Sequence, residues 1–441
     1  MNTLYHPTPL RASVQTARNF YLRCNAMPLY GHCRGVLKTA CDVGIVEGRV
    51  ILDPRADPKR QRANSTLAET ILYHTVERGS LGAGGTPLPA PLRDEEVLRE
   101  LDVYCRLTRL ERSGAPLTEF IPLLNNGRAP LALLAKIADY AVTHNEAEAL
   151  QYLVGSWTGP FRTYSSMDEI RDLLRMDAIA GERIYAPVAE LFGYQELAGD
   201  ILRHSYGVNH PEIYALVMDT LASEEVRARL AATQSIARKL ARSIRDTLRS
   251  FDYEAEVAIR MQKHAGKLMR KVRRRLRGDA ENGVPALFAM DVEKISDWVA
   301  LRVVVRRHEK REIDALAEDR KWRVIEGAVG IIDMCLQTMQ LLRGGYSFSH
   351  AFKDKTNGYR AHHWDMRAEK PDNPSGSLPL PFEIQLKTSE WHEVAERGKA
   401  AHYYYIGGES EFVDMIADAY REILHKYDPT PAEQPGQARP G

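Results

Sequence analysis

The segment from Arg260 to Arg277 concentrates positive charge, because it contains nine lysine and arginine residues and no acidic one. On a helix, positions i, i+4, i+7, i+11 and i+14 lie along one face. In this segment those positions are Lys263, Lys267, Arg270, Arg274 and Arg277. Two interpretations remain open at this point: a solvated helix face, or a site that neutralises the phosphates of a nucleotide or a nucleic acid.

Two carboxylates further along the chain bear on this choice. Asp297 directly precedes the apolar run WVALRVVV, and Glu383 lies inside the run FEIQLKT. Both runs are typical of buried strands, where a carboxylate is costly unless it faces a cleft, a cation or a metal. On neighbouring strands facing the basic segment, the two acids would form a site for Mg²⁺ and a triphosphate. An ion pair with a core arginine is the alternative, and spacing alone does not decide.

The elements that must position these residues begin with a helical region. The chain has 441 residues, which predicts about three domain-sized units. Residues from about 10 to 45 have a helical pattern with a break at Met27-Pro28, and LALLAKIADYAV has the period of a buried helix. The Pro- and charge-rich stretch Glu47–Ser65 indicates a loop. No segment before about residue 150 is typical of a sheet.

The pattern changes in the C-terminal half. Helical periodicity continues from 168 to 250, and strands are indicated after about residue 285. The runs WVALRVVV, HHWDMR and PFEIQLK predict strands, and WRVIEGAVGIIDMCLQTMQLL predicts a helix between them. We therefore expect a mixed α/β region, followed by a Pro- and Gly-rich tail without a packed structure.

Composition excludes several classes of protein. Apolar residues make up 44% and charged residues 27%, which is typical of a globular chain with a buried core. The 60 basic and 59 acidic residues leave a net charge of +1, so no chain-wide field attracts polyanions or membranes. The five cysteines have no zinc-type spacing, and no stretch has the pattern of a secretory signal or a membrane span. We expect a soluble, cytoplasmic protein with no membrane partner.

Five motifs resemble, in order, those of the RelA/SpoT family of (p)ppGpp synthetases and hydrolases. They lie at Lys263–Lys271, Asp297–Val305, Lys355–His363 (KTNGYRAHH), Phe382–Thr388 (FEIQLKT) and Trp391–Tyr405 (WHEVAERGKAAHYYY). No single motif would be specific, but five motifs in the same order are. Upstream, RIYAPVAELFGY is also similar to a family segment, and the resemblance extends over roughly residues 20 to 425.

The resemblance implies a pyrophosphokinase that moves pyrophosphate from ATP to the ribose 3′-oxygen of GDP or GTP. Asp297 and Glu383 match its two acidic positions around Mg²⁺, and Glu383 is the candidate to orient or deprotonate the attacking hydroxyl. Lys263 and Lys271 match lysines that bind the ATP phosphates. Arg260 is next to the position of the family's ATP-binding arginine, which Met261 occupies here.

The acceptor nucleotide is implied to lie against a second group of residues. Tyr359 matches the aromatic residue that stacks on guanine. Lys355, Asn357, His363 and Gln385 match positions that line the acceptor and its phosphates. Stacking does not select guanine over adenine, because every base has a π-face. The acceptor, and with it the exact product, therefore stays open.

In the N-terminal region, ILYH and KIAD resemble remnants of the HD hydrolase motifs. The resemblance implies that His32, His74 and Asp139 are three ligands of a vestigial metal site for Mn²⁺. Thr75 stands where the family has the aspartate of the HD pair, and a hydroxyl is a poor substitute for a carboxylate ligand. We favour a core histidine for His74 and expect the hydrolase activity to be lost or weak.

These observations predict four parts. An all-α, degenerate HD-like domain spans residues 1–165, and a helical connector spans residues 166–250. An α/β nucleotidyltransferase-like synthetase domain with a mixed sheet spans residues 251–426, and a disordered tail spans residues 427–441. We expect an alarmone synthetase that uses ATP and GDP or GTP. Transfer to an adenine nucleotide or an RNA 3′ end is an alternative, although RNA is not favoured. A Mn²⁺-dependent (p)ppGpp hydrolase or a nucleotide-binding regulator is another.

Overall fold

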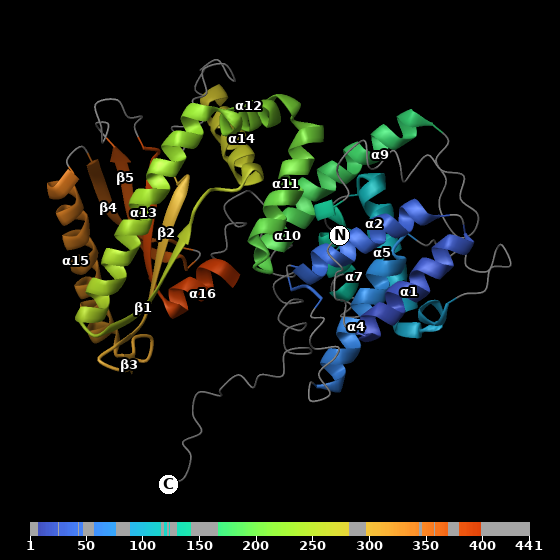
Figure 1. Cartoon of the computed structure of the whole chain (residues 1–441), viewed down its shortest axis with the longest axis horizontal. Coiled ribbons are helices and arrows are strands. Elements are labelled where there is room, and N and C mark those ends of the chain that lie inside the picture. The colour runs from blue at the N-terminus through green and yellow to red at the C-terminus, as the bar shows by residue number, and fades with distance from the viewer. Residues whose placement is uncertain are drawn as a thin grey trace, which may run out of the picture. The chain divides into compact units, whose positions relative to one another are not determined.

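The computed structural model divides into two compact units. The first ends at Val208 and the second begins at Asn209 (Figure 1). The structure describes residues 8–24, 26–42, 44–46, 57–75, 89–115, 119–120, 123, 130–142, 166–281, 297–343, 346–356, 358–368 and 379–397. The predicted tail 427–441 lies outside these residues, and the predicted connector 166–250 is shared between the two units.

The regular elements described in the first unit are all helical, as the sequence predicts. They are α1 (Thr8–Arg23), α2 (Met27–Asp42), α4 (Pro58–Tyr73), the short η2 (Ala90–Arg93), α5 (Glu95–Ser113), α7 (Pro130–Val142), α9 (Met167–Ala180), the π-helical turn η3 (Gly181–Tyr185), α10 (Ala186–Leu191) and α11 (Gln195–Asn209). The core is formed where α2, α4, α5 and α7 pack against one another. None of the described helices of the chain is long and apolar enough to cross a membrane.

The prediction of a loop over Glu47–Ser65 is wrong in its second half, because α4 begins at Pro58. The Asp57 side chain accepts a hydrogen bond from the Lys59 N–H at 3.1 Å, which caps the helix. Proline is favoured at the first helical position, where its missing N–H costs nothing. The charge and proline content that suggested a loop therefore starts a helix instead.

The second unit is built on a mixed sheet, as predicted. Its helices are α12 (Pro211–Ala222), α13 (Glu224–Ser250), α14 (Ala265–Glu281), α15 (Glu318–Arg343) and α16 (Ser389–Arg397). Its strands are β1 (Tyr253–Arg260), β2 (Val299–His308), β3 (Arg311–Glu312), β4 (Tyr346–Asp354), β5 (Arg360–Ala368) and β6 (Phe382–Thr388). The order is β1-β2-β6-β5-β4, with β3 paired to β2. The central pair β2 and β6 is parallel, and the other pairs are antiparallel.

The two faces of the sheet differ in polarity because successive side chains of a strand point to opposite faces. Ile384 and Trp364 are register partners on one face and are fully buried. The Trp364 indole donates to Asp333 of α15 at 2.7 Å, so α15 covers this apolar face. Glu383, the residue before Ile384 on β6, therefore lies on the opposite, polar face.

Strand β1 corrects the assignment of the basic segment. The sequence suggested strands only after about residue 285, but β1 ends at Arg260, and α14 begins at Ala265. Lys263 therefore lies in the connection between them and not on the helical stripe. Polar residues alternate along YEAEVAIR because β1 is an edge strand, which obscured the apolar signal.

Helix α13 holds the chain segments next to β6 and β1 by hydrogen bonds. Thr233 accepts a hydrogen bond from the Leu380 N–H at 2.8 Å, just before β6. The neighbouring Gln234 donates to the Met261 carbonyl at 3.0 Å, just after β1. The chain entering β6 and the chain leaving β1 are thus held by consecutive residues of one helix.

Candidate functional site

The first half of the candidate site is Asp297, which is 8% exposed and precedes β2. Its backbone is in the left-handed region, with φ of 65°, which costs energy for a residue that is not glycine. Arg260 donates to the Asp297 carbonyl at 2.6 Å, and the Lys263 N–H donates to the Trp298 carbonyl at 2.8 Å. These contacts hold the turn that presents the carboxylate.

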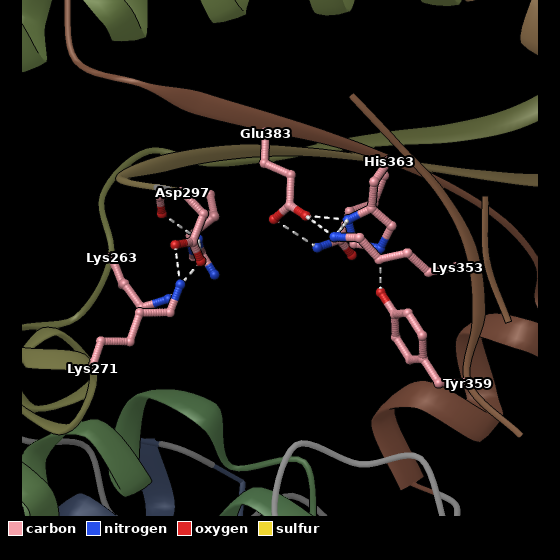
Figure 2. Close-up of polar contacts among 9 residues, drawn as sticks. Lys263, Lys271, Asp297, Lys353, Tyr359, His363 and Glu383 are labelled. Atoms are coloured by element: carbon pink, nitrogen blue, oxygen red, sulfur yellow. Dashed lines mark hydrogen bonds and ion pairs between the residues drawn. The ribbon is translucent and has the colours of Figure 1, made fainter. Parts of the chain in front are cut away.

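Three cations surround the Asp297 carboxylate (Figure 2). Lys263 Nζ lies 2.5 Å and Arg260 Nη2 lies 3.2 Å from Oδ2, while Lys271 pairs with Oδ1. Burial alone would raise the pKa of Asp297, but the charges of the three cations hold it well below its usual range. Burial lowers the pKa of Lys263 to about 7, and the neighbouring cations add to this against the attraction of Asp297.

The second half of the site is Glu383 on β6, also 8% exposed. His363 pairs through Nδ1 with Glu383 Oε1, and Gln385 Nε2 donates to Oε2 at 3.0 Å. The Tyr359 hydroxyl lies 2.7 Å from His363 Nε2, and Lys353 Nζ lies 4.0 Å from Glu383 Oε1. Burial raises the pKa of Glu383, but the hydrogen bond and charge of His363 outweigh it and leave the pKa below its usual value.

The two carboxylates share one face of the sheet. Glu383 is the register partner of Ala300, three residues after Asp297, across the parallel β2–β6 pair. The charge of Asp297 acts to raise the pKa of Glu383, so the two groups lie within electrostatic reach. Both point away from the strands toward the same space (Figure 2). The structure therefore brings together the two acids that the sequence predicted on neighbouring strands.

Tyr359 follows a tight turn after β4. The Lys355 N–H donates to the Tyr359 carbonyl at 3.0 Å, and Gly358 has φ of 83°, a conformation that glycine adopts without strain. Lys387 Nζ lies 5.0 Å and Lys355 Nζ 5.5 Å from the centroid of the Tyr359 ring. These distances are typical of cation–π contacts. Asn357, predicted to line the acceptor, lies outside the described residues.

Sequence reasoning missed two lysines of this site, Lys353 and Lys387. Lys387 lies on β6 at the same face as Glu383 and Gln385, since the three residues alternate along the strand. It is 3% exposed, which is rare for a lysine. The alternation of polar and apolar residues in FEIQLKT could have placed Lys387 on the same face as Glu383.

In the first unit, three predicted residues converge on one point. His32 Nε2 lies 3.0 Å from His74 Nε2 and 3.0 Å from Asp139 Oδ1, and the last two atoms are 3.5 Å apart. Ligands at bonds of about 2.1 Å around a tetrahedral metal are about 3.4 Å apart. The three atoms therefore have the spacing of metal ligands.

Neighbouring groups orient these donors. His74 Nδ1 lies 2.6 Å from the Ile71 carbonyl, so Nδ1 carries a proton and Nε2 is the atom available to a ligand. The Tyr104 hydroxyl donates to the second oxygen of Asp139. Burial lowers the pKa of His74, but Cys33 and Asp139 outweigh it and raise the pKa, so a metal would displace a proton there.

Thr75 takes no part in this cluster. Its hydroxyl lies 2.8 Å from the Tyr21 hydroxyl and 3.7 Å from Cys33 Sγ. The cluster of metal-type donors among the described residues is limited to His32, His74 and Asp139. It therefore lacks the second carboxylate of an HD pair.

Comparison with known proteins identifies the domain that contains the two acids. Residues 260–410 match the family model described as a region found in RelA/SpoT proteins. A GTP pyrophosphokinase of Photobacterium angustum is 23% identical over 371 residues, which cover 81% of this chain and 41% of that protein. A chloroplastic GTP diphosphokinase of Oryza sativa subsp. japonica is 25% identical over 239 residues, covering 54% and 36%. The chain thus spans less than half the length of these relatives.

Among solved structures, the small alarmone synthetase 1 from Bacillus subtilis is 17% identical with a TM-score of 0.28, and the match covers 46% of this chain and 90% of that one.

Proposed function

Since its RelA/SpoT region places the chain in the RelA/SpoT family, we propose that the chain is an alarmone synthetase that transfers pyrophosphate from ATP to the 3′-hydroxyl of GDP or GTP. The observation that carries this proposal is the pair Asp297 and Glu383 on adjacent parallel strands, beside a cluster of cations. Both acids lie within the matched residues 260–410.

In this reaction the acceptor 3′-oxygen attacks the β-phosphorus of ATP. The bond from that phosphorus to the oxygen bridging it to the α-phosphate breaks, and AMP leaves. Glu383 accepts the proton of the 3′-hydroxyl, and its ionised state is maintained by His363 and Gln385. Lys263 and Lys271 neutralise the charge of the transferred group, which is the main demand of phosphoryl transfer.

The residues present fit a magnesium ion in type, because Asp297 and Glu383 offer the carboxylate oxygens that Mg²⁺ prefers. A bound Mg²⁺ would neutralise phosphate charge at these two residues. The cations on Asp297 compete with a metal ion for the same carboxylate oxygens.

The acceptor side rests on Tyr359, His363 and the lysines around them. The Tyr359 ring offers a surface for a base, and Lys353, Lys355 and Lys387 lie close enough to bind acceptor phosphates. None of the described side chains around Tyr359 rejects adenine. Transfer to an adenine nucleotide or to an RNA 3′ end therefore remains the alternative.

The test is an acceptor panel. The purified full chain is incubated with Mg²⁺ and ATP together with GDP, GTP, ADP or tRNA, and AMP and 3′-pyrophosphorylated products are resolved by chromatography. We expect AMP in equal amount to product with GDP or GTP. Absence of AMP with every acceptor would refute the synthetase. Product with ADP or tRNA alone would show that the acceptor is an adenine nucleotide or an RNA 3′ end and not GDP or GTP.

A second function concerns the first unit. We infer that His32, His74 and Asp139 bind a divalent metal such as Mn²⁺, which replaces the core histidine that the sequence favoured for His74. We expect no (p)ppGpp hydrolysis there, because the carboxylate expected at Thr75 is missing. The spacing of the three donor atoms favours this inference. Metal content and Mn²⁺ titration should show a site that His74→Ala removes. Manganese-dependent release of pyrophosphate from ppGpp by the unmodified chain would contradict the loss of hydrolysis.

A further inference from the structure

The Asp297 carboxylate is occupied on both oxygens. Lys263 and Arg260 contact Oδ2, and Lys271 contacts Oδ1. An ammonium or guanidinium group donates hydrogen bonds into the same lone pairs that a metal ion would use. In this arrangement a metal must displace at least one cation before it can reach Asp297.

Charge opposes that displacement. Arg260 and Lys271 already exceed the single negative charge of Asp297, and Lys263, whose pKa is lowered to about 7, adds to them in part. A divalent cation alone would therefore meet positive charge around this carboxylate. Burial of the carboxylate strengthens this repulsion, because screening by water is weak there. We therefore expect little affinity of this centre for a free metal ion.

A triphosphate reverses the balance. It carries several negative charges and offers oxygens to the same lysines and arginine. The side chains of Lys271 and Arg260 are 21% and 40% exposed, so they can turn toward a ligand, whereas Lys263 is 6% exposed and stays beside Asp297. Transfer of Lys271 to a phosphate frees Oδ1 of Asp297 for the metal.

We propose that Arg260, Lys263 and Lys271 form an electrostatic gate that makes metal binding at Asp297 depend on a bound nucleoside triphosphate. The proposal rests on the proposed function, since it takes ATP as the ligand that opens the gate. In the free protein all three cations bind Asp297; with nucleotide, Lys271 and Arg260 bind phosphate, Lys263 stays beside Asp297, and Oδ1 of Asp297 binds the metal. Linkage then requires that metal and nucleotide strengthen each other's binding by the same factor.

The test measures binding without turnover. The full chain, stripped of metal, is titrated with Mn²⁺, and free Mn²⁺ is followed by its EPR signal with and without α,β-methylene-ATP, whose α–β linkage cannot be cleaved. The Asp297 component is the binding lost in Asp297→Asn, which separates it from Mn²⁺ held by the first unit. We expect the nucleotide to tighten this component by about 10- to 100-fold.

Lys271→Met should open the gate without nucleotide. Its Asp297-dependent Mn²⁺ affinity in the free protein should rise by about 10-fold, and the gain from nucleotide should shrink accordingly. Lys239→Met, which removes an exposed lysine of α13 from the same unit, is the matched control and should behave as the unmodified chain. If Lys271→Met does not fold, as judged by circular dichroism, Arg260→Gln serves the same purpose.

Equal Mn²⁺ binding at Asp297 with and without nucleotide would refute the gate, even if the acceptor panel yields AMP. Unchanged metal affinity in a folded Lys271→Met would also refute it. Conversely, nucleotide-dependent Mn²⁺ binding without AMP formation would support the gate and contradict the synthetase. The two proposals therefore fail separately.

Discussion

Asp297 in the second unit and Asp139 in the first are equally buried, each 8% exposed, yet they are surrounded by different chemistry. Asp297 faces an arginine and two lysines, whereas Asp139 faces the Nε2 atoms of two imidazoles. Lysine and arginine side chains only donate hydrogen bonds, but an imidazole that loses its proton becomes a metal ligand. Buried carboxylates therefore do not define a metal site on their own; their partners do.

The largest test of the contrast removes the charge of Glu383. Glu383→Gln keeps the size of the side chain but cannot accept the proton of the acceptor hydroxyl. We expect AMP formation to fall by about 10³-fold. The rate of AMP release measures this, and metal binding by the first unit should be unchanged.

Glu254→Gln is the matched control, because this glutamate lies on the same sheet with a 60% exposed side chain. It should retain full activity. A Glu383→Gln enzyme that is folded and within a few-fold of normal activity would remove Glu383 from the reaction.

The next test separates the two aspartates by stability. Asp297→Asn leaves the buried Lys263 without its charged partner, which should destabilise the second unit. We expect a loss of about 2 kcal/mol in the free energy of unfolding, less than for a fully buried pair because Lys263 can release its proton. Urea unfolding followed by circular dichroism measures it.

Asp139→Asn offers the counterpart in the first unit. There the histidines can become neutral when the carboxylate is lost, so we expect a smaller loss of stability than at Asp297. A larger loss at Asp139 would show that the contrast between fixed cations and imidazoles does not govern stability.

A finer test addresses the metal affinity of the first unit. Tyr104→Phe removes the hydroxyl that orients Asp139 and should weaken Mn²⁺ binding by about 10-fold. Tyr140→Phe is the matched control, because its hydroxyl contacts Glu111 at 2.9 Å instead. Isothermal titration of both variants compares them, and equal affinities would deny Tyr104 an orienting role.

The smallest effect concerns a third acid, Asp177 of α9. Burial raises the pKa of Asp177 to about 7. The charges of Glu111 and Asp139 also raise it, whereas those of Arg112 and Lys136 lower it. The folded state then binds a proton that the unfolded state loses near pH 4, so stability falls as pH rises from about 4 to about 7. Asp177→Asn should remove this loss, so its stability relative to the unmodified chain should be higher at pH 8 than at pH 5. Thermal unfolding at pH 5 and pH 8 checks it, and an equal difference at both pH values would contradict it.

The sequence predicted the pairing that matters most for the candidate site. Asp297 and Glu383 were expected on neighbouring strands because each adjoins a short β-branched run, and β2 and β6 are adjacent. The helical first region was also predicted, since its apolar residues recur at helical spacing. Both signals are local, and local signals can be read from one sequence.

What could not be predicted depends on contacts between distant residues. Lys271 and Arg260 meet at Asp297 from a helix and a strand, 26 and 37 residues away in sequence. The helical spacing of the basic segment suggested a different stripe, because Lys263 proves to lie before the helix. Lys353 joins the site through strand pairing with β5, which no local pattern reveals.

The two hydrogen bonds from α13 have a mechanical consequence. Thr233 fixes the chain that leads to Glu383, and Gln234 fixes the chain that leads to Lys263. One turn of α13 thus sets the distance between the lysines proposed to bind ATP and the glutamate proposed to act on the acceptor hydroxyl. A tilt of α13 would change the distance between the Asp297 cluster and the Glu383 cluster while leaving the contacts within each cluster intact.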